Sequence, residues 1–312
     1  MTKVTCMVKK DLKLLLRENT VIILLSIFVV MTLASTGIEW SAQHTIKQVY
    51  NVASQELVKA GNPVPTLPLP SMSSLSLMKN MIIYIVLIGA LLAITMGHVA
   101  SINDRQAGVI RILFSKPFSR TDFFLAKVLS SSIIIFVSLF IAMIVSIISI
   151  YSMRGMSSNQ VLNVCVFYLV SFVYLAGFAY IGLFFGMNSD NSTNAILFPL
   201  LLWIVITFAL PEFASALYPT GSLNPVLPST NMLDSPILKV MHSSIYPFSI
   251  SEQYKALSAH IFGLSSDTVL NKRSHYSPWA NLIILSAWST LTLILSYLSA
   301  KRLNTAEGDT YE

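Results

Sequence analysis

The residues with the most specific spacing lie in a polar, basic segment, residues 103–127, between two long apolar runs. Its cations are Arg105, Arg111, Lys116, Arg120 and Lys127. A basic segment between membrane spans is expected on the cytoplasmic side, because Lys and Arg are retained there. Residue types alone leave two interpretations open: a loop that only sets topology, or a surface that contacts a partner.

The order of residues within this segment predicts a helix, a break and a second helix. Residues 109–114 are apolar except for Arg111, and Pro117 then stops helix propagation and biases Lys116 away from the α region. Ser119 and Asp122 form a capping-box pattern that marks the start of the next helix. We therefore expect a short amphipathic helix on the inner membrane face, a sharp break and a re-entering helix.

The same spacing resembles the cytoplasmic coupling segment of ABC-2 type transporter permeases. That family shows an acidic residue and Arg, then Gly, a Leu-rich turn, Ser-x-Pro-x-Ser-Arg, and a Lys in the following helix. The close resemblance covers residues 103–127, and the hydropathy layout extends it over the chain. The sequence departs from the pattern at Gln106, Val109, Ile110 and Phe114.

The resemblance implies a coupling site, where a cytoplasmic ATPase subunit pushes on the permease. The residues that it assigns to this site are Asp104, Arg105, Gly108, Arg111, Leu113, Phe114, Ser115, Pro117, Ser119 and Arg120. It also implies a second permease copy, most simply as a homodimer, ATP bound only by the partner subunit, and export as the usual direction. An extracytoplasmic accessory protein is a further candidate partner.

Composition places the chain in the membrane. Hydrophobic residues make up 54% and charged residues 11%, whereas soluble proteins average about 25% charged residues. The net charge of +6 would suggest nucleic acid in a soluble protein. Here the cations flank apolar runs, so membrane lipid with anionic headgroups is the expected partner, and no nucleic acid.

Hydropathy predicts an all-α protein, a single transmembrane domain over residues 1–312. Six spans are expected at about residues 20–38, 80–100, 124–151, 161–186, 195–210 and 278–300. Polar loops over 39–79 and 211–279 should project outward, the second with a helix over 249–262 lying on the outer face. Residues 3–18 read either as an amphipathic elbow helix at the interface or as a plain basic tail that sets topology.

The distribution of cations orients this layout. The segments expected inside contain 12 Lys and Arg in 70 residues, and those expected outside contain 8 in 121. Both termini should therefore be on the cytoplasmic side of the cell membrane.

Small residues in the fourth span suggest close helix packing. Gly182 and Gly186 are spaced as a small-xxx-small motif, with Gly177 nearby. Sequence leaves open whether this surface meets another helix of the same subunit or a second copy.

The sequence contains no catalytic motif that would indicate an enzyme. It lacks a P-loop, an H-E-x-x-H and a G-x-S-x-G pattern. The spans as drawn contain essentially no ionisable side chains, which argues against coupling to an ion gradient. A transporter of this kind must take its energy from a separate ATPase, which agrees with the coupling segment.

Methionines and histidines expected on the outer face offer one candidate metal site. Met241 and His242 are adjacent, and thioether and imidazole groups suit copper(I). The alternative is that methionines fill apolar gaps at the membrane surface. The lack of a tight M-x-M or H-x-M spacing favours that alternative.

The function expected from these observations is that of an ABC-2 permease. Two alternatives remain open: a mechanotransmitting permease that acts on an outer-face partner without conducting a solute, and a membrane anchor or assembly subunit that does not transport. The sequence does not indicate a substrate.

Overall fold

The computed structural model of the protein describes residues 3–63, 74–106, 119–189, 191–217, 240, 243–264 and 276–302. These residues are largely helical, and none of them is in a β-strand. Among them, six helical stretches are long and apolar enough to cross a membrane: Asn19–Lys59, Ser74–Asp104, Arg120–Arg154, Ser158–Asn188, Ser192–Phe213 and Pro278–Arg302. The prediction of an all-α protein with six transmembrane helices is confirmed.

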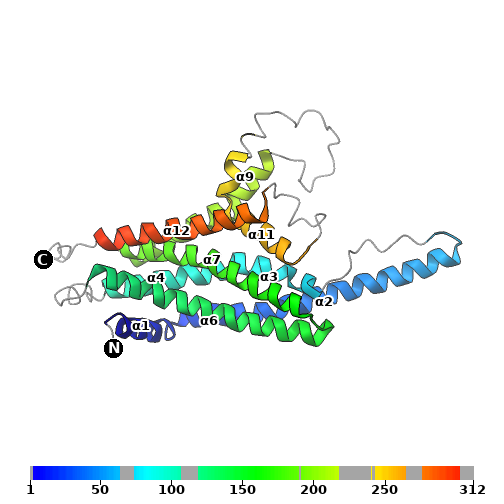
Figure 1. Ribbon diagram of the computed structural model, residues 1–312, viewed down its shortest axis with the longest axis horizontal. Coiled ribbons are helices and arrows are strands. Elements are labelled where there is room, and N and C mark those ends of the chain that lie inside the picture. Colours follow the sequence, from blue (N-terminus) through cyan, green and yellow to red (C-terminus); the bar gives the residue numbers. More distant parts are fainter. Residues whose placement is uncertain are drawn as a thin grey trace.

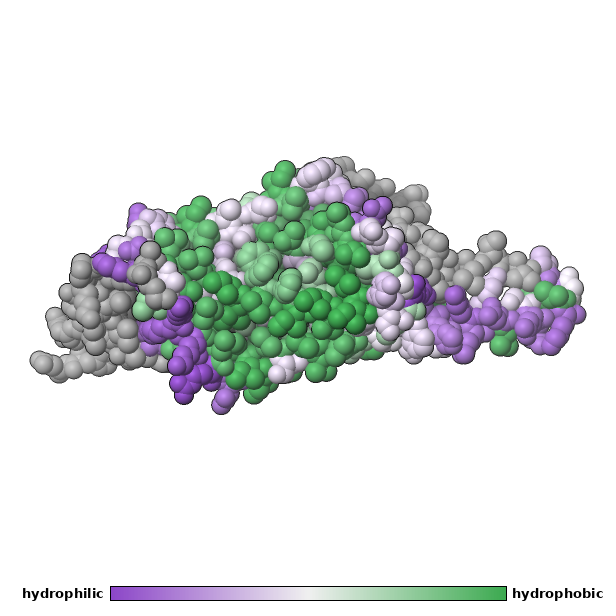
Figure 2. All heavy atoms as spheres, turned by 60° about the horizontal axis from the view of Figure 1, so that its bottom comes forward, coloured by the Kyte–Doolittle hydropathy of each residue, from purple (hydrophilic) through white to green (hydrophobic). Residues whose placement is uncertain are grey.

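The helices form an elongated bundle around α7 (Ser158–Asn188), which packs against α4 (Ala90–Gln106), α6 (Arg120–Arg154) and α12 (Pro278–Arg302) (Figure 1). The helix α1 (Lys3–Leu15) and the end of α12 lie at one end of this bundle, here called the inner end. Apolar side chains cover the middle of the bundle, and hydrophilic ones gather at its ends (Figure 2). This banding is what a bilayer requires.

Glycines let α4 and α7 approach each other closely. A Cβ added to Gly97 would collide with the carbonyl of Ala179, and one added to Gly182 would collide with that of Ile94. A Cβ added to Gly186 would collide with the hydroxyl of Ser101 on α4, and one added to Gly177 would collide with the indole of Trp288 on α12. All three predicted packing glycines therefore serve contacts within one subunit, so the dimer seam that the sequence left open is not needed to explain them.

The first transmembrane helix is much longer than predicted. We expected a span at 20–38 and a polar loop from residue 39, but α2 runs without interruption from Asn19 to Lys59. Residues 41–59 contain neither Gly nor Pro, so nothing in them stops the helix, which ends before Gly61 with its positive φ of 71°. The loop prediction was wrong for residues 39–59, and the part of α2 that follows Gln43 projects beyond the outer end of the bundle (Figure 1).

Two spans contain a turn of π-helix. The second span comprises η1 (Ser74–Met78), α3 (Lys79–Tyr84), the π-helical η2 (Ile85–Gly89) and α4. The fifth comprises α8 (Ser192–Ile204), the π-helical η3 (Val205–Ala209) and α9 (Leu210–Leu217). Both extend past the predicted limits of 80–100 and 195–210.

Side chains from neighbouring elements reach both π-helical turns. The indole N–H of Trp203 donates to the carbonyl of Val86 in η2, 3.3 Å away. The hydroxyl of Ser251 donates to the carbonyl of Ile206 in η3, also at 3.3 Å. A π-turn disturbs the regular helical ladder, and these donors pair with carbonyls inside it.

The outer segment 211–279 is more buried than expected. It includes η5 (Tyr246–Phe248) and α11 (Ile250–Ile261), so the predicted helix over 249–262 is present. It packs into the bundle instead of lying on it. The ring of Tyr254 stacks on Tyr174 of α7 at 4.5 Å, and its hydroxyl bonds to Ser171 at 2.7 Å. Ser251, Ser258 and Ala259 of α11 are fully buried as well.

Candidate functional site

Three elements meet at the inner end: α1, the last turns of α4 and the first turns of α6. The helix α1 buries Met7, Val8 and Leu15 on one face and exposes lysines on the other. One of the two bonds of the predicted capping box is present at the first turn of α6, where the Ser119 side chain accepts a hydrogen bond from the backbone N–H of Asp122 at 3.0 Å. The end of α4 and the start of α6 are joined by residues 107–118, which we call the link.

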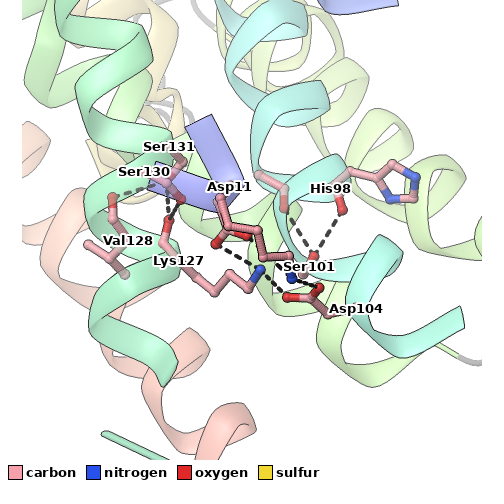
Figure 3. Close-up of polar contacts among 10 residues, drawn as sticks. Asp11, His98, Ser101, Asp104, Lys127, Val128, Ser130 and Ser131 are labelled. Carbon is pink, nitrogen blue, oxygen red and sulfur yellow. Dashed lines mark hydrogen bonds and ion pairs between the residues drawn. The ribbon is translucent and has the colours of Figure 1, made fainter. Parts of the chain in front are cut away.

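Four charged side chains form a ring of alternating sign between these elements. Lys127 of α6, only 1% exposed, contacts the carboxylate of Asp104 on α4 and lies 2.9 Å from that of Asp11 on α1. Lys10 of α1 contacts the other oxygen of Asp104 and lies 3.9 Å from Asp11. Figure 3 shows the Lys127 ammonium between the two carboxylates, which come from different helices. The ring thus joins all three elements.

Burial makes this charge balance necessary. Asp11 and Asp104 are 3% and 2% exposed, and the apolar side chains of Leu14, Leu15, Val99 and Ala100 line the space beside them. Removing one partner from a buried ion pair leaves an uncompensated charge in a medium of low dielectric constant. Burial raises the pKa of Asp11 above its ordinary value, against the opposing effect of the Lys127 ammonium.

The backbone and an aromatic ring fix the position of Lys127. Its carbonyl accepts hydrogen bonds from the hydroxyls of Ser130 and Ser131, both at 3.0 Å. Its ammonium lies 5.4 Å from the centroid of the Phe123 ring, within the range of a cation–π interaction. The two serines lie one turn of α6 after Lys127 and Phe123 lies one turn before it. The ammonium itself contacts the aromatic ring of Phe123 and the carboxylates of Asp11 and Asp104.

The structure describes three of the predicted coupling residues in full. Asp104 points into the ring, Ser119 caps α6, and the guanidinium of Arg120 donates to the carbonyl of Lys301 at the end of α12. The remaining predicted positions lie outside the described residues or have side chains that the structure does not describe: Arg105, Gly108, Arg111, Leu113, Phe114, Ser115 and Pro117. The candidate metal residues Met241 and His242 also lie outside the described residues.

The ring corrects one expectation from the sequence. We drew the spans as essentially free of ionisable side chains, but Asp104 and Lys127 are both buried at the inner ends of spans. They are tolerated there because each neutralises the other and α1 supplies a second pair of charges. The signal was available in α1, since Asp11 falls on the same helical face as Val4, Val8 and Leu15.

In the described part of the chain, no three His, Cys, Asp or Glu side chains gather as a metal site would require. The four charges of the ring are paired with one another on α1 and on the two helices that flank the link. Comparison with known families gave a match to the family described as ABC-2 family transporter protein, over residues 6–304. Comparison with curated proteins gave no match.

Proposed function

Because the chain belongs to the ABC-2 family of transporter proteins, whose members are membrane subunits without a catalytic site of their own, we propose that it is the permease of an ATP-binding cassette transporter. A separate ATPase subunit binds and hydrolyses ATP, and the permease uses the resulting movement to export or transfer a substrate. The chain thereby gains the energy source that its own sequence lacks.

The observation that carries this proposal is the buried ion pair between the two helices that flank the link. The link carries the apolar and basic residues that resemble a coupling helix, and its two flanking helices are joined by the buried pair Asp104–Lys127. A surface that receives a push must be fixed at its base, because otherwise the movement is lost as local flexing. The buried pair provides that fixed base.

The proposed orientation follows from the charges at the same end of the molecule. The inner end carries the basic face of α1 and the cations at the end of α12, Lys301 and Arg302. This distribution supports a cytoplasmic location for both termini and for the link in the cytoplasmic membrane. Two permease copies with two ATPase subunits complete the proposed transporter.

Alanine substitution in the link tests the proposal. Leu113→Ala and Phe114→Ala should each remove an apolar anchor of about 2 kcal/mol, which corresponds to roughly 30-fold weaker ATPase binding. Co-purification with the ATPase and stimulated ATP turnover are the measurements. Leu129→Ala is a matched control, because Leu129 is exposed on the apolar part of α6. If both link variants bind and stimulate the ATPase like the parent, the coupling assignment is wrong.

One observation favours a second candidate function, mechanotransmission to a protein outside the membrane. The 41 residues of α2 span about 60 Å, whereas the hydrocarbon core of a bilayer is about 30 Å thick. The part of α2 beyond Gln43 exposes Ile46, Val49 and Val52 at the outer end. Such a rod can carry movement to an outer-face partner, and ATP-dependent activity without solute flux in proteoliposomes would support this function over export.

A further inference from the structure

We propose that Lys10 and Asp11 make α1 a clamp on both flanks of the link, so that α1 moves with the link and drives α2 as a lever reaching past the outer end of the bundle. This inference rests on the proposed function and names the residues that would join α1 to the flanks of the link. Lys10 and Asp11 act as positioning residues, because they would contact neither ATP nor a substrate.

The first step is the division of contacts between two adjacent residues. Lys10 contacts Asp104, on the helix that enters the link, and Asp11 contacts Lys127, on the helix that leaves it. Since Asp104 and Lys127 also contact each other, any displacement of the flanks acts on α1 through two ion pairs of opposite polarity. One ion pair would leave α1 free to swivel about a single contact, whereas two fix its direction.

The second step is the short connection from α1 to α2. Only Leu16, Arg17 and Glu18 separate the two helices. Backbone hydrogen bonds run through this turn, from Arg17 N–H to Leu14 O at 3.1 Å and from Glu18 N–H to Leu15 O at 3.3 Å. A hydrogen-bonded turn of three residues has little slack, so a displacement of α1 is passed to the start of α2.

The third step is the reach of α2. It is one uninterrupted helix, and most of its surface faces away from the bundle. Near the outer end, Gln43 donates to the hydroxyl of Ser76 at 2.9 Å, which ties α2 to the start of the second span. Beyond this contact α2 continues to Lys59. Movement at its inner end would therefore appear at the second span and at the projecting end.

The alternative is that the apolar face of α1 alone holds it in place. Met7, Val8 and Leu15 would then suffice, and the ring would only balance charge. The double variant Lys10→Met/Asp11→Asn distinguishes a clamp made by the ion pairs from attachment by apolar packing alone. It removes one charge of each sign, keeps the Asp104–Lys127 pair and leaves the apolar face intact, so the bundle should still fold. Lys13→Met is the matched control, because Lys13 is exposed on α1 and makes no ion pair among the described residues.

The first measurement uses the permease alone. Spin labels on the native, exposed Cys6 of α1 and on Leu125→Cys of α6, with Cys165→Ala, report the distance between the two helices. We expect a narrow distribution in the parent and in Lys13→Met and a broad one in the double variant. A distribution that stays narrow in the double variant would show that apolar packing holds α1, and would overturn the clamp.

The second measurement uses the complex with its ATPase in nanodiscs. Labels on Val58→Cys of α2 and Tyr151→Cys of α6, with Cys6→Ser and Cys165→Ala, follow the outer ends of the two helices with and without ATP and vanadate. We expect an ATP-dependent shift in the parent that is lost in the double variant, although ATPase co-purification stays within twofold. A shift that persists in the double variant, or no shift in the parent complex, would overturn the lever while the proposed function stands. Failure of the ATPase to bind the parent would instead refute the proposed function, and the lever with it.

Discussion

The ammonium of Lys127 lies 2.9 Å from the carboxylate of Asp11, although the two residues belong to the third transmembrane helix and to the N-terminal helix. The same ammonium contacts Asp104 at the end of α4. One fully buried cation therefore joins three elements at the point where the link begins and ends. The contact turns a basic N-terminal segment into an integral part of the bundle.

Replacing Lys127 should destabilise the protein strongly. Lys127→Met leaves two buried carboxylates with only the half-exposed Lys10 to balance them, and breaking a buried ion pair in this way costs about 3–5 kcal/mol. Thermal unfolding in detergent, read through loss of the monodisperse peak, measures the effect. Lys127→Arg keeps the positive charge, so its loss of thermal stability should be much smaller. Equal loss in both variants would mean that side-chain shape, and not charge, matters at this position.

The raised pKa of Asp11 predicts a pH dependence of stability. A carboxyl whose folded-state pKa lies above its ordinary value of 3.8 favours the folded state while it is protonated, and this contribution is lost as the pH rises through the raised pKa. Asp11→Asn cannot titrate. Its stability relative to the parent should therefore grow as the pH rises from about 4. Unfolding temperatures of the two proteins measured across that range test the sign, and a falling difference would contradict it.

The close contact between α4 and α7 at Gly182 should not tolerate a larger side chain. Gly182→Leu would drive its Cβ into the backbone of Ile94, so the helices must separate, and expression as a monodisperse protein should fail. Gly37→Ala provides the control, since a Cβ there meets nothing within 4 Å. Alanine is the better helix former by about 1 kcal/mol, so this variant should be as stable as the parent or more so.

The indole of Trp203 should stabilise the π-helical turn of the second span. Trp203→Phe keeps an aromatic ring but removes the donor to Val86 O, which costs about 1–3 kcal/mol when a buried acceptor loses its partner. Trp279→Phe, at a position 75% exposed, should change stability little. Chemical unfolding of both variants is the measurement. Similar behaviour of the two would indicate that the carbonyl of Val86 finds another donor.

Labelling of single cysteines tests which end of the bundle is cytoplasmic. A membrane-impermeant maleimide is added to intact cells. It should modify Val58→Cys at the projecting end of α2 in a chain with Cys6→Ser and Cys165→Ala, and spare the native Cys6 of α1 in a chain with Cys165→Ala alone. After permeabilisation both should react, because both positions are exposed. The reverse pattern would invert the topology and remove the proposed contact between the link and a cytoplasmic ATPase.

The sequence by itself determined the class of the protein and the number of its spans. Runs of about 20 apolar residues have only one stable form in a bilayer, because every backbone N–H and C=O group must be paired within the helix. The capping pattern at Ser119 was equally local, and the structure contains the predicted bond. The coupling pattern over 103–127 indicated the family before any contact was known.

Only the tertiary structure decided the site. The apolar face of α1 indicates that Asp11 is buried, but Asp11, Asp104 and Lys127 are far apart in the chain, and nothing local shows that the three meet. The same is true of Gly182, whose partner is a backbone carbonyl on another helix. The sequence contains nothing that would end α2 before Gly61, but the polar composition of residues 39–59 suggested a loop. A helix that projects from a bundle needs no apolar face along its whole length, so hydropathy alone could not mark where it ends.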